Sequence, residues 1–313
     1  MDVHKIVIPT PYAVGDVNAY LVKGDVLTLF DAGPKTEEAY DAIKWGIRAA
    51  GYELTDVEQV VLTHHHPDHA GWVDAFPHTE KLGHRYVDYF LRKEDAFLAY
   101  HQHFYAAQLR LAGVPEKYIE KLIKVRGEIE LFGSTPLTGF LQEGDEVPGH
   151  PGLLVYETPG HAQSHVIFIE DSTRECIGGD LLIERVSSNP LVEPPLDLSD
   201  VRPKSLLQYN ASLKRLRELD VTKIYTGHGN EVINAAELVT ERLARQHERA
   251  MKVLEMISES KTLFDVTKEL FARIYMQQLG LTLSETLGQL DYLVDEGLAT
   301  ETLQDGMIYY QKL

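Results

Sequence analysis

The segment Thr63-His64-His65-His66-Pro67-Asp68-His69-Ala70-Gly71 is the most informative stretch of this sequence. It directly follows Val57–Thr63, a run rich in β-branched residues that predicts a β-strand. The histidines therefore occupy the turn that leaves the carboxyl end of a strand, where α/β folds place their ligands. A histidine-rich surface loop is the alternative interpretation, but four ligand-type side chains within so short a segment favour a metal site.

The order of these residues predicts how their side chains are directed. In an extended chain, His64 and His66 point to one side and His65 points to the other. Pro67 suits the first position of a helix, whose first turn would then contain the next two residues, Asp68 and His69. We therefore expect His65 to point away from the other ligand-type side chains.

Three later segments place further ligand-type residues beside glycine, which allows the backbone to approach closely. Thr158-Pro159-Gly160-His161 ends one predicted strand, Gly178-Gly179-Asp180 lies within another, Cys176–Ile183, and Tyr225-Thr226-Gly227-His228-Gly229 ends the last. We expect the same end of the sheet to collect them. Nitrogen and carboxylate donors suit Zn²⁺, and also Fe²⁺ or Mn²⁺, whereas the lack of nearby cysteine argues against a closed structural zinc site.

This set of motifs resembles the metallo-β-lactamase superfamily in its hydrolase form, whose His-x-His-x-Asp-His motif and three later ligands match in order and type. The resemblance covers about residues 1–230 and implies an α/β fold, an αββα sandwich with two divalent metal ions at one edge. It implies that His64, His66 and His161 bind one ion, that Asp68, His69 and His228 bind the second, and that Asp180 bridges them. Zinc is the ion we expect first, with iron or manganese as alternatives.

The same resemblance implies roles for other residues. Asp31, in a Phe-Asp-Ala-Gly turn, would support the ligands, and His65 would not be a ligand. A hydroxide that bridges the two ions would be the nucleophile, with Asp68 and Asp180 as the catalytic carboxylates. Cys176, in an apolar strand, is interpreted as a small core residue.

The motif is more specific for fold and metals than for substrate. Its spelling is most similar to glyoxalase II and its relatives, but the glutathione-binding segment of that enzyme is replaced here. We predict a hydrolase of a small ester, lactone or thioester. The alternatives are an endoribonuclease or phosphodiesterase, a single-iron sulfur dioxygenase, and a non-enzymatic metal-binding regulatory protein.

Two additions to the catalytic domain are predicted. Residues 1–233 form that domain, in which strand-like and helix-like segments alternate as in a layered α/β architecture. Within it, Arg85–Phe132 predicts helices broken at Gly113-Val114-Pro115 and is rich in aromatic residues. We interpret this segment, about residues 85–132, as a helical insert that caps the site.

Residues 234–313 predict a small second domain. Its pattern indicates three helices, Ala236–Ser258, Leu263–Tyr275 and Leu283–Asp295, and a hairpin around Gln304-Asp305-Gly306. This order resembles a winged helix. Residues 231–313 contain eight basic and 14 acidic side chains, a net charge of −6, whereas a DNA reader carries a basic face. We therefore expect a packing or dimerisation module, with a homodimer as its consequence.

The composition limits the classes of partner. The 313 residues carry 30 Lys and Arg against 48 Asp and Glu, a formal net charge of −18, which disfavours nucleic acid as a partner and leaves a small-molecule substrate. The single cysteine, Cys176, excludes an intrachain disulfide framework. No apolar leader and no stretch of about 18 apolar residues occurs, so we expect a cytoplasmic protein that does not span a membrane.

Overall fold

The chain forms two compact units, each built from several segments. The computed structural model describes residues 1–123, 129–195, 197, 199 and 201–313. Unit 1 comprises Met1–Glu94, Arg126–Ser188 and Ser212–Val239, and unit 2 comprises Asp95–Val125, Asn189–Ala211 and Thr240–Leu313. The predicted boundary between residues 233 and 234 stays a prediction.

Unit 1 contains two sheets. In the six-stranded sheet the spatial order is the chain order, with antiparallel pairing from β1 to β3 and parallel pairing from β3 to β6. Its strands are β1 (Asp2–Ile8), β2 (Val17–Lys23), β3 (Leu27–Phe30), β4 (Gln59–Leu62), β5 (Glu80–Gly83) and β6 (Gly139–Phe140). The four-stranded sheet has the order β10-β9-β8-β7, with β9 and β10 parallel, and its strands are β7 (Leu153–Glu157), β8 (Val166–Glu170), β9 (Glu175–Gly179) and β10 (Lys223–Thr226).

A hydrophobic core joins the two sheets of unit 1. Phe30 and Val61 of the first sheet belong to the same buried cluster as Val155 and Phe168 of the second. The rings of Phe30 and Phe168 meet edge to face at 5.1 Å. Packing of these buried apolar side chains against one another holds the two sheets together.

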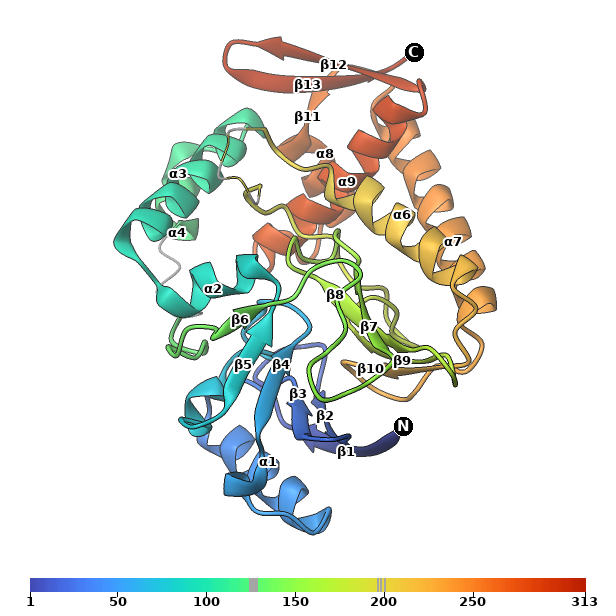
Figure 1. The fold of residues 1–313 in the computed structure, drawn as a ribbon. Coiled ribbons are helices and arrows are strands. Elements are labelled where there is room, and N and C mark those ends of the chain that lie inside the picture. The colour runs from blue at the N-terminus through green and yellow to red at the C-terminus, as the bar shows by residue number, and fades with distance from the viewer. Residues whose placement is uncertain (124–128, 196, 198, 200) are drawn as a thin grey trace. The chain divides into compact units, whose positions relative to one another are not determined.

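Helices cover the outer faces of these sheets. Helix α1 (Glu37–Ala49) begins at the N-cap Thr36, whose hydroxyl accepts the Ala39 N–H, and its buried face packs on the first sheet, visible in blue in Figure 1. A Cβ on Gly46 of α1 would lie 2.5 Å from Ile6 of β1, so glycine permits this close packing. At the second sheet, Arg215 of α6 (Ser205–Glu218) lies over the Tyr156 ring of β7.

Two local predictions in unit 1 are wrong. The helix expected at Pro67 is a single turn, in which His69 and Ala70 donate to the His66 carbonyl; the next helical element, a 3₁₀ turn, begins only at Trp72. The strand expected to run to Ile183 ends at Gly179, because Gly179 adopts a positive φ of 45°. Asp180 therefore lies in a turn and not within a strand.

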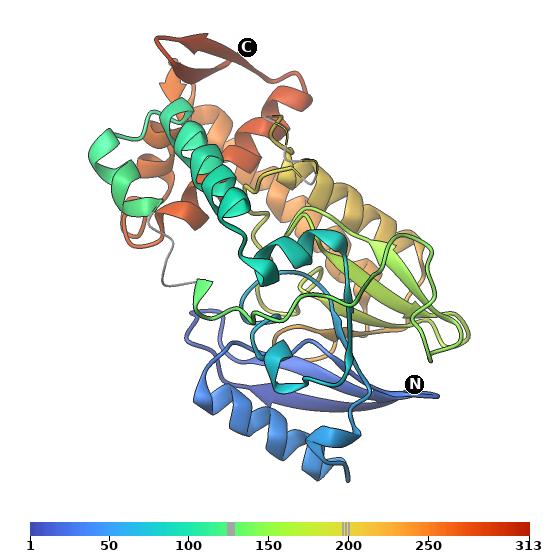
Figure 2. The ribbon, with the colours of Figure 1, turned by 60° about the vertical axis from the view of Figure 1, so that its left-hand side comes forward.

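Unit 2 is mainly helical, with one small sheet. The helices that lie in it wholly or in large part are α3 (Asp95–Leu111), α4 (Glu116–Leu122), α7 (Ala235–Met256), α8 (Leu263–Leu270) and α9 (Leu279–Asp295). The sheet has the order β11-β13-β12, with strands β11 (Lys261–Thr262), β12 (Ala299–Gln304) and β13 (Met307–Lys312). The predicted three helices and terminal hairpin are present, and Figure 2 shows α7, α8, α9 and the hairpin in orange to red.

The predicted helical insert is divided between the units. Helix α2 (Arg85–Arg92) belongs to unit 1, whereas α3 and α4 share a buried cluster with α7, α8 and α9. The residues 124–128 of the predicted insert lie outside the described part of the chain. Among the described helices, none combines the length and apolarity that a membrane span requires.

Candidate metal centre

Seven ligand-type side chains of unit 1 converge where four strands end. His64, His66, Asp68 and His69 follow β4, and the other three follow β7, β9 and β10: His161, Asp180 and His228. Their ligand atoms form a first group, His64 with His66 and His161, and a second group, Asp68 with His69 and His228; a third set, His64 with His69 and Asp180, overlaps both, and within each set the atoms lie within 4.8 Å of one another. All seven predicted residues are brought together.

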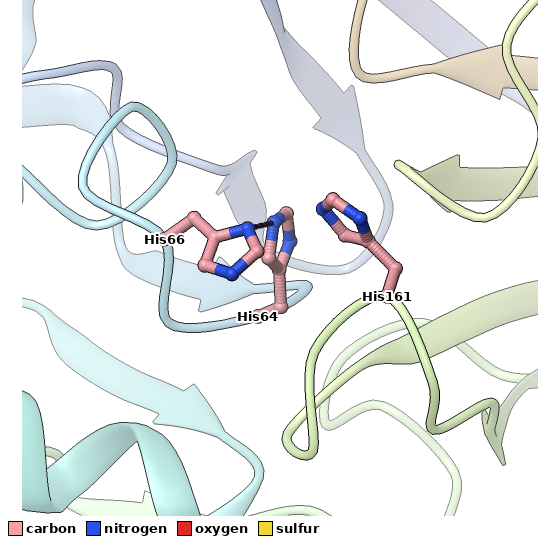
Figure 3. Close-up of side chains that lie close together, drawn as sticks. All are labelled: His64, His66 and His161. Atoms are coloured by element: carbon pink, nitrogen blue, oxygen red, sulfur yellow. Dashed lines mark hydrogen bonds between the residues drawn. The ribbon is translucent and has the colours of Figure 1, made fainter. Parts of the chain in front are cut away.

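The first group consists of three imidazoles. Figure 3 shows His64, His66 and His161 directed toward one another, with His64 Nε2 3.0 Å from His66 Nδ1. The Thr63 hydroxyl donates to a carboxylate and therefore accepts the His64 Nδ1–H at 2.9 Å, which leaves the lone pair of Nε2 directed into the group. Burial, together with the neighbouring His69 and His66, holds the pKa of His64 well below its usual value. His64 thus offers a neutral nitrogen ligand to this group.

The second group combines carboxylate and imidazole. His228 Nε2 lies 3.4 Å from Asp68 Oδ2, and His69 Nε2 lies 4.0 Å from the same oxygen. The other ring nitrogens are held from behind: His69 Nδ1 donates to Asp31 Oδ2 at 2.8 Å, and His228 Nδ1 donates to the Asp16 carbonyl at 2.8 Å. These contacts fix both Nε2 atoms toward the site, as outer contacts of metal-binding histidines do.

Asp180 lies between the two groups. Its Oδ1 is 3.4 Å from His69 Nε2, and its Oδ2 is 3.5 Å from both His161 Nε2 and His228 Nε2. One carboxylate therefore faces histidines of both groups. A glycine makes room for it, because a Cβ on Gly227 would lie 2.0 Å from Asp180 Oδ1.

The electrostatics of this cluster are governed by buried carboxylates. Burial opposes a charge on His69, but Asp180, Asp31 and Asp68 outweigh it and hold the pKa of His69 well above its usual value. Burial likewise opposes protonation of His228, and Asp180 together with Asp68 raises its pKa to about 10. Burial favours the neutral form of Asp180, yet His228 and His69 hold its pKa well below the usual range. In the metal-free chain, protons on imidazoles thus balance the carboxylates.

The donor set fits divalent transition-metal ions. Imidazole nitrogen and carboxylate oxygen are the ligands such ions take in catalytic sites. The buried atoms His69 Nε2 and Asp180 Oδ1 face each other at 3.4 Å without forming a hydrogen bond, and neither has another hydrogen-bond partner among the described residues. Buried polar atoms normally have partners, so atoms of this kind indicate a missing ligand.

Three further residues, His65, Asp31 and His165, lie beside the ligand groups. His65 belongs to none of the groups that contain His64 or His69; its Nδ1 lies 2.8 Å from Ser164 Oγ, and its ring stacks on Phe90. Asp31 supports His69 as the resemblance implied. The buried His165, which contacts Asp180, was missed because its spacing after His161 matches no ligand pattern.

Comparisons with known proteins agree with this geometry. The family model described as Metallo-beta-lactamase superfamily matches residues 12–228. Probable metallo-hydrolase YqjP of Bacillus subtilis (strain 168) is 40% identical over 316 residues, covering 100% of this chain and 98% of that protein.

Solved structures show the same fold. A metallo-beta-lactamase family protein from Thermus thermophilus has a TM-score of 0.80 at 26% identity and covers 99% of this chain and 98% of its own. A beta-lactamase domain protein from Burkholderia ambifaria has a TM-score of 0.80 at 20% identity, with coverage of 100% and 93%, which shows a shared fold alone. The chain therefore belongs to the metallo-beta-lactamase superfamily and is a metal-dependent hydrolase.

Proposed function

We propose that this hydrolase holds two divalent ions, zinc in first place, and cleaves a small ester, lactone or thioester. His64, His66 and His161 would hold one ion, Asp68, His69 and His228 the other, and Asp180 would be shared. The observation that carries this proposal is the position of the Asp180 carboxylate, within 3.5 Å of histidines from both groups. Seven ligands exceed what one tetrahedral ion needs.

The ions would supply an activated water at neutral pH and a Lewis acid for the carbonyl oxygen of the substrate. The protein contributes the orientation of the ligands. Asp31 and the Asp16 carbonyl hold His69 and His228 in the tautomers that direct Nε2 into the site. Asp68 lies beside His228, and we assign it an orienting role in which its carboxylate would accept a hydrogen bond from the attacking water.

The choice of a small acyl substrate over nucleic acid is supported by the charge of the chain and by unit 2. The C-terminal order of helices and strands is proposed to be winged-helix-like. In such a module the third helix reads DNA. Here that helix, α9, buries most of its residues, including Leu287, Leu290 and Leu293. We therefore assign residues 234–313 a packing role and propose a homodimer.

The proposed function is tested by metal analysis and a substrate panel. Protein purified without chelator is expected to contain two transition-metal ions per chain and to hydrolyse members of an ester, lactone and thioester panel. One iron per chain with oxygen uptake would instead identify a dioxygenase. Salt-dependent binding and cleavage of single-stranded RNA would identify a nuclease. Two ions with no turnover on any class would identify a binding protein.

A further inference from the structure

The backbone at Asp180 leaves the sheet in an unusual way. The parallel register of β9 and β10 pairs Ile177 with Tyr225 and then Gly179 with Thr226, so one residue of β9 is skipped. Gly179 has a φ of 45°, and a Cβ there would lie 2.8 Å from Thr63 Oγ1. A left-handed residue after a bulge rotates the next N–H out of the strand ladder. The Asp180 N–H thus needs an acceptor other than a backbone carbonyl of a neighbouring strand.

That acceptor is the imidazole of His165. The side chain is buried, and its Nε2 lies 3.0 Å from the Asp180 nitrogen. A backbone N–H can only donate, so Nε2 carries the lone pair and Nδ1 carries the proton. Nδ1 lies 2.8 Å from Thr158 Oγ1, which accepts that proton. The hydrogen bonds therefore form a directed chain, in which the Asp180 N–H donates to His165 and His165 donates to Thr158.

His165 is a histidine among metal ligands that is not itself placed as one. Its ring centre lies 5.0 Å from that of His64 and 6.0 Å from that of His161, yet it belongs to none of the ligand groups among the described residues. Both ring nitrogens already have partners in the protein, at Thr158 and at Asp180. His165 therefore has no ring nitrogen left to bind a metal ion, unlike the neighbouring histidines.

We propose that His165 is a positioning residue that sets the place of the Asp180 carboxylate between the two metal groups. The peptide carbonyl of Asp180 accepts a hydrogen bond from the Ser188 hydroxyl, so His165 and Ser188 hold the residue at its N–H and at its C=O. The carboxylate then reaches His69 through Oδ1 and His161 and His228 through Oδ2. The inference rests on the proposed sharing of Asp180 by two ions and adds the residue that makes the sharing possible.

The test compares two substitutions of His165. His165→Leu keeps an apolar volume but removes the acceptor, whereas His165→Gln can return an acceptor oxygen near the position of Nε2. We expect His165→Leu to weaken binding of the second Zn²⁺ by about 10- to 100-fold in competition with a chelator, and to lower kcat more than it raises KM. His165→Gln is expected to stay within about threefold of the natural protein. With Co²⁺ in both sites, His165→Leu should also lose the magnetic coupling between the ions.

A matched control separates positioning from stability. His150 is also buried and lies 2.6 Å from a threonine hydroxyl, that of Thr28, but it has no contact with Asp180. His150→Leu should lower the thermal midpoint and leave zinc affinity and magnetic coupling unchanged. If His165→Leu does not fold, Thr158→Val decides instead: it keeps the imidazole, frees Nδ1 and is expected to weaken the second ion, while Thr158→Ser is not.

The outcomes distinguish this inference from the proposed function. If Asp180→Asn loses the second ion and folded His165→Leu binds both ions as tightly as the natural protein, the positioning role is wrong and the shared ligand stands. Unchanged zinc affinity in Thr158→Val would have the same meaning if His165→Leu cannot be folded. If Asp180→Asn also keeps both ions and their coupling, the shared-ligand assignment itself is wrong.

Discussion

At the scale of single residues, the Asp180 carboxylate is packed tightly against Gly227. A Cβ on Gly227 would lie 2.0 Å from Asp180 Oδ1 and 2.9 Å from the His69 ring, although the φ of Gly227 is not positive. The need for glycine is therefore steric and not conformational. The Gly227 N–H also donates to the Gly179 carbonyl at 2.7 Å, which ties the two turns together.

We expect Gly227→Ala to displace the Asp180 carboxylate and to reduce kcat/KM on the order of 100-fold, because misplacement of a catalytic group by about 1 Å has effects of this size. Steady-state kinetics and zinc content measure the effect. Gly280→Ala is the control, since a Cβ on Gly280 meets nothing within 4 Å. Equal activity of the two variants would mean that Asp180 is free to move.

The alternating directions of neighbouring histidines give a second prediction. His66→Ala is expected to empty one of the two proposed sites, because His66 Nδ1 faces His64 Nε2 in the first group. His65→Ala should keep both ions, since His65 is directed to Ser164 and Phe90. Metal content after dialysis against a weak chelator measures both. Equal metal loss in the two variants would contradict the assignment of His65.

The raised pKa values of His69 and His228 predict proton release on metal binding. Both imidazoles are expected to carry a second proton, and with it a positive charge, at pH 7 in the metal-free chain, since the pKa of His228 is about 10 and that of His69 is well above its usual value. Ligands bind metal only when deprotonated. Zinc added at pH 7 should therefore release on the order of two protons per chain, and the part of the release that comes from His228 should decline as the pH rises through about 10. Calorimetry in buffers of different ionisation enthalpy counts the protons; no release at pH 7 would contradict the charge assignment.

At the scale of elements, α9 is packed against its neighbours among the described helices of unit 2. Most of its residues are buried, so α9 offers little exposed surface for contact with a DNA groove. Gly288 of α9 meets α6 closely, because a Cβ there would lie 2.8 Å from Leu206 Cβ. Asp291 of α9 is fully buried, and its two carboxylate oxygens accept hydrogen bonds from the two terminal guanidinium nitrogens of Arg202, each at 2.7 Å. A helix fixed by such contacts is part of a core.

We predict that Gly288→Val destabilises the protein by about 1 to 3 kcal/mol, the usual cost of overpacking a core, without changing the metal content. Urea unfolding measures the first effect and metal analysis the second. Gly280→Ala, on an open position of the same helix, should differ from the natural protein by less than about 0.5 kcal/mol. A neutral Gly288→Val would mean that α6 and α9 separate readily.

At the scale of the whole molecule, the folded arrangement and the ions stabilise each other. The ligand-type side chains at four separate strand ends meet only when unit 1 is folded, so we expect the proposed ions to bind the folded chain and not the unfolded one. Binding at 100 times the dissociation constant stabilises a fold by about 2.7 kcal/mol for each site.

We therefore expect removal of the ions with a chelator to lower the thermal midpoint by about 5 °C or more, and re-addition of zinc to restore it. Differential scanning calorimetry measures the change. In Asp180→Asn the difference between the zinc-loaded and chelated protein should be smaller. An identical thermal midpoint with and without the ions would contradict the proposal that the ions bind these ligands in the folded chain.

The sequence by itself predicted which ligand-type side chains lie together, and it predicted the main elements. His64, His66, Asp68 and His69 follow a β-branched run, and His161 and His228 follow similar runs, so residue type and strand ends alone place them together. The amphipathic helix after Thr36 and the hairpin at Asp305-Gly306 were predictable for the same reason: their signals lie within a few residues.

The tertiary structure decided what depends on distant neighbours. The end of β9 at Gly179 follows from Thr63 and His165, which approach it from other strand ends, and no local pattern around Asp180 reports them. The turn at Pro67 stays a single turn because the chain after it is drawn to the first sheet, where Ala32 donates to the His69 carbonyl and Gly71 donates to that of Gly33. The division of Arg85–Phe132 between two units was equally invisible, because hydrophobic periodicity shows that a helix has a buried face and does not show which core that face joins.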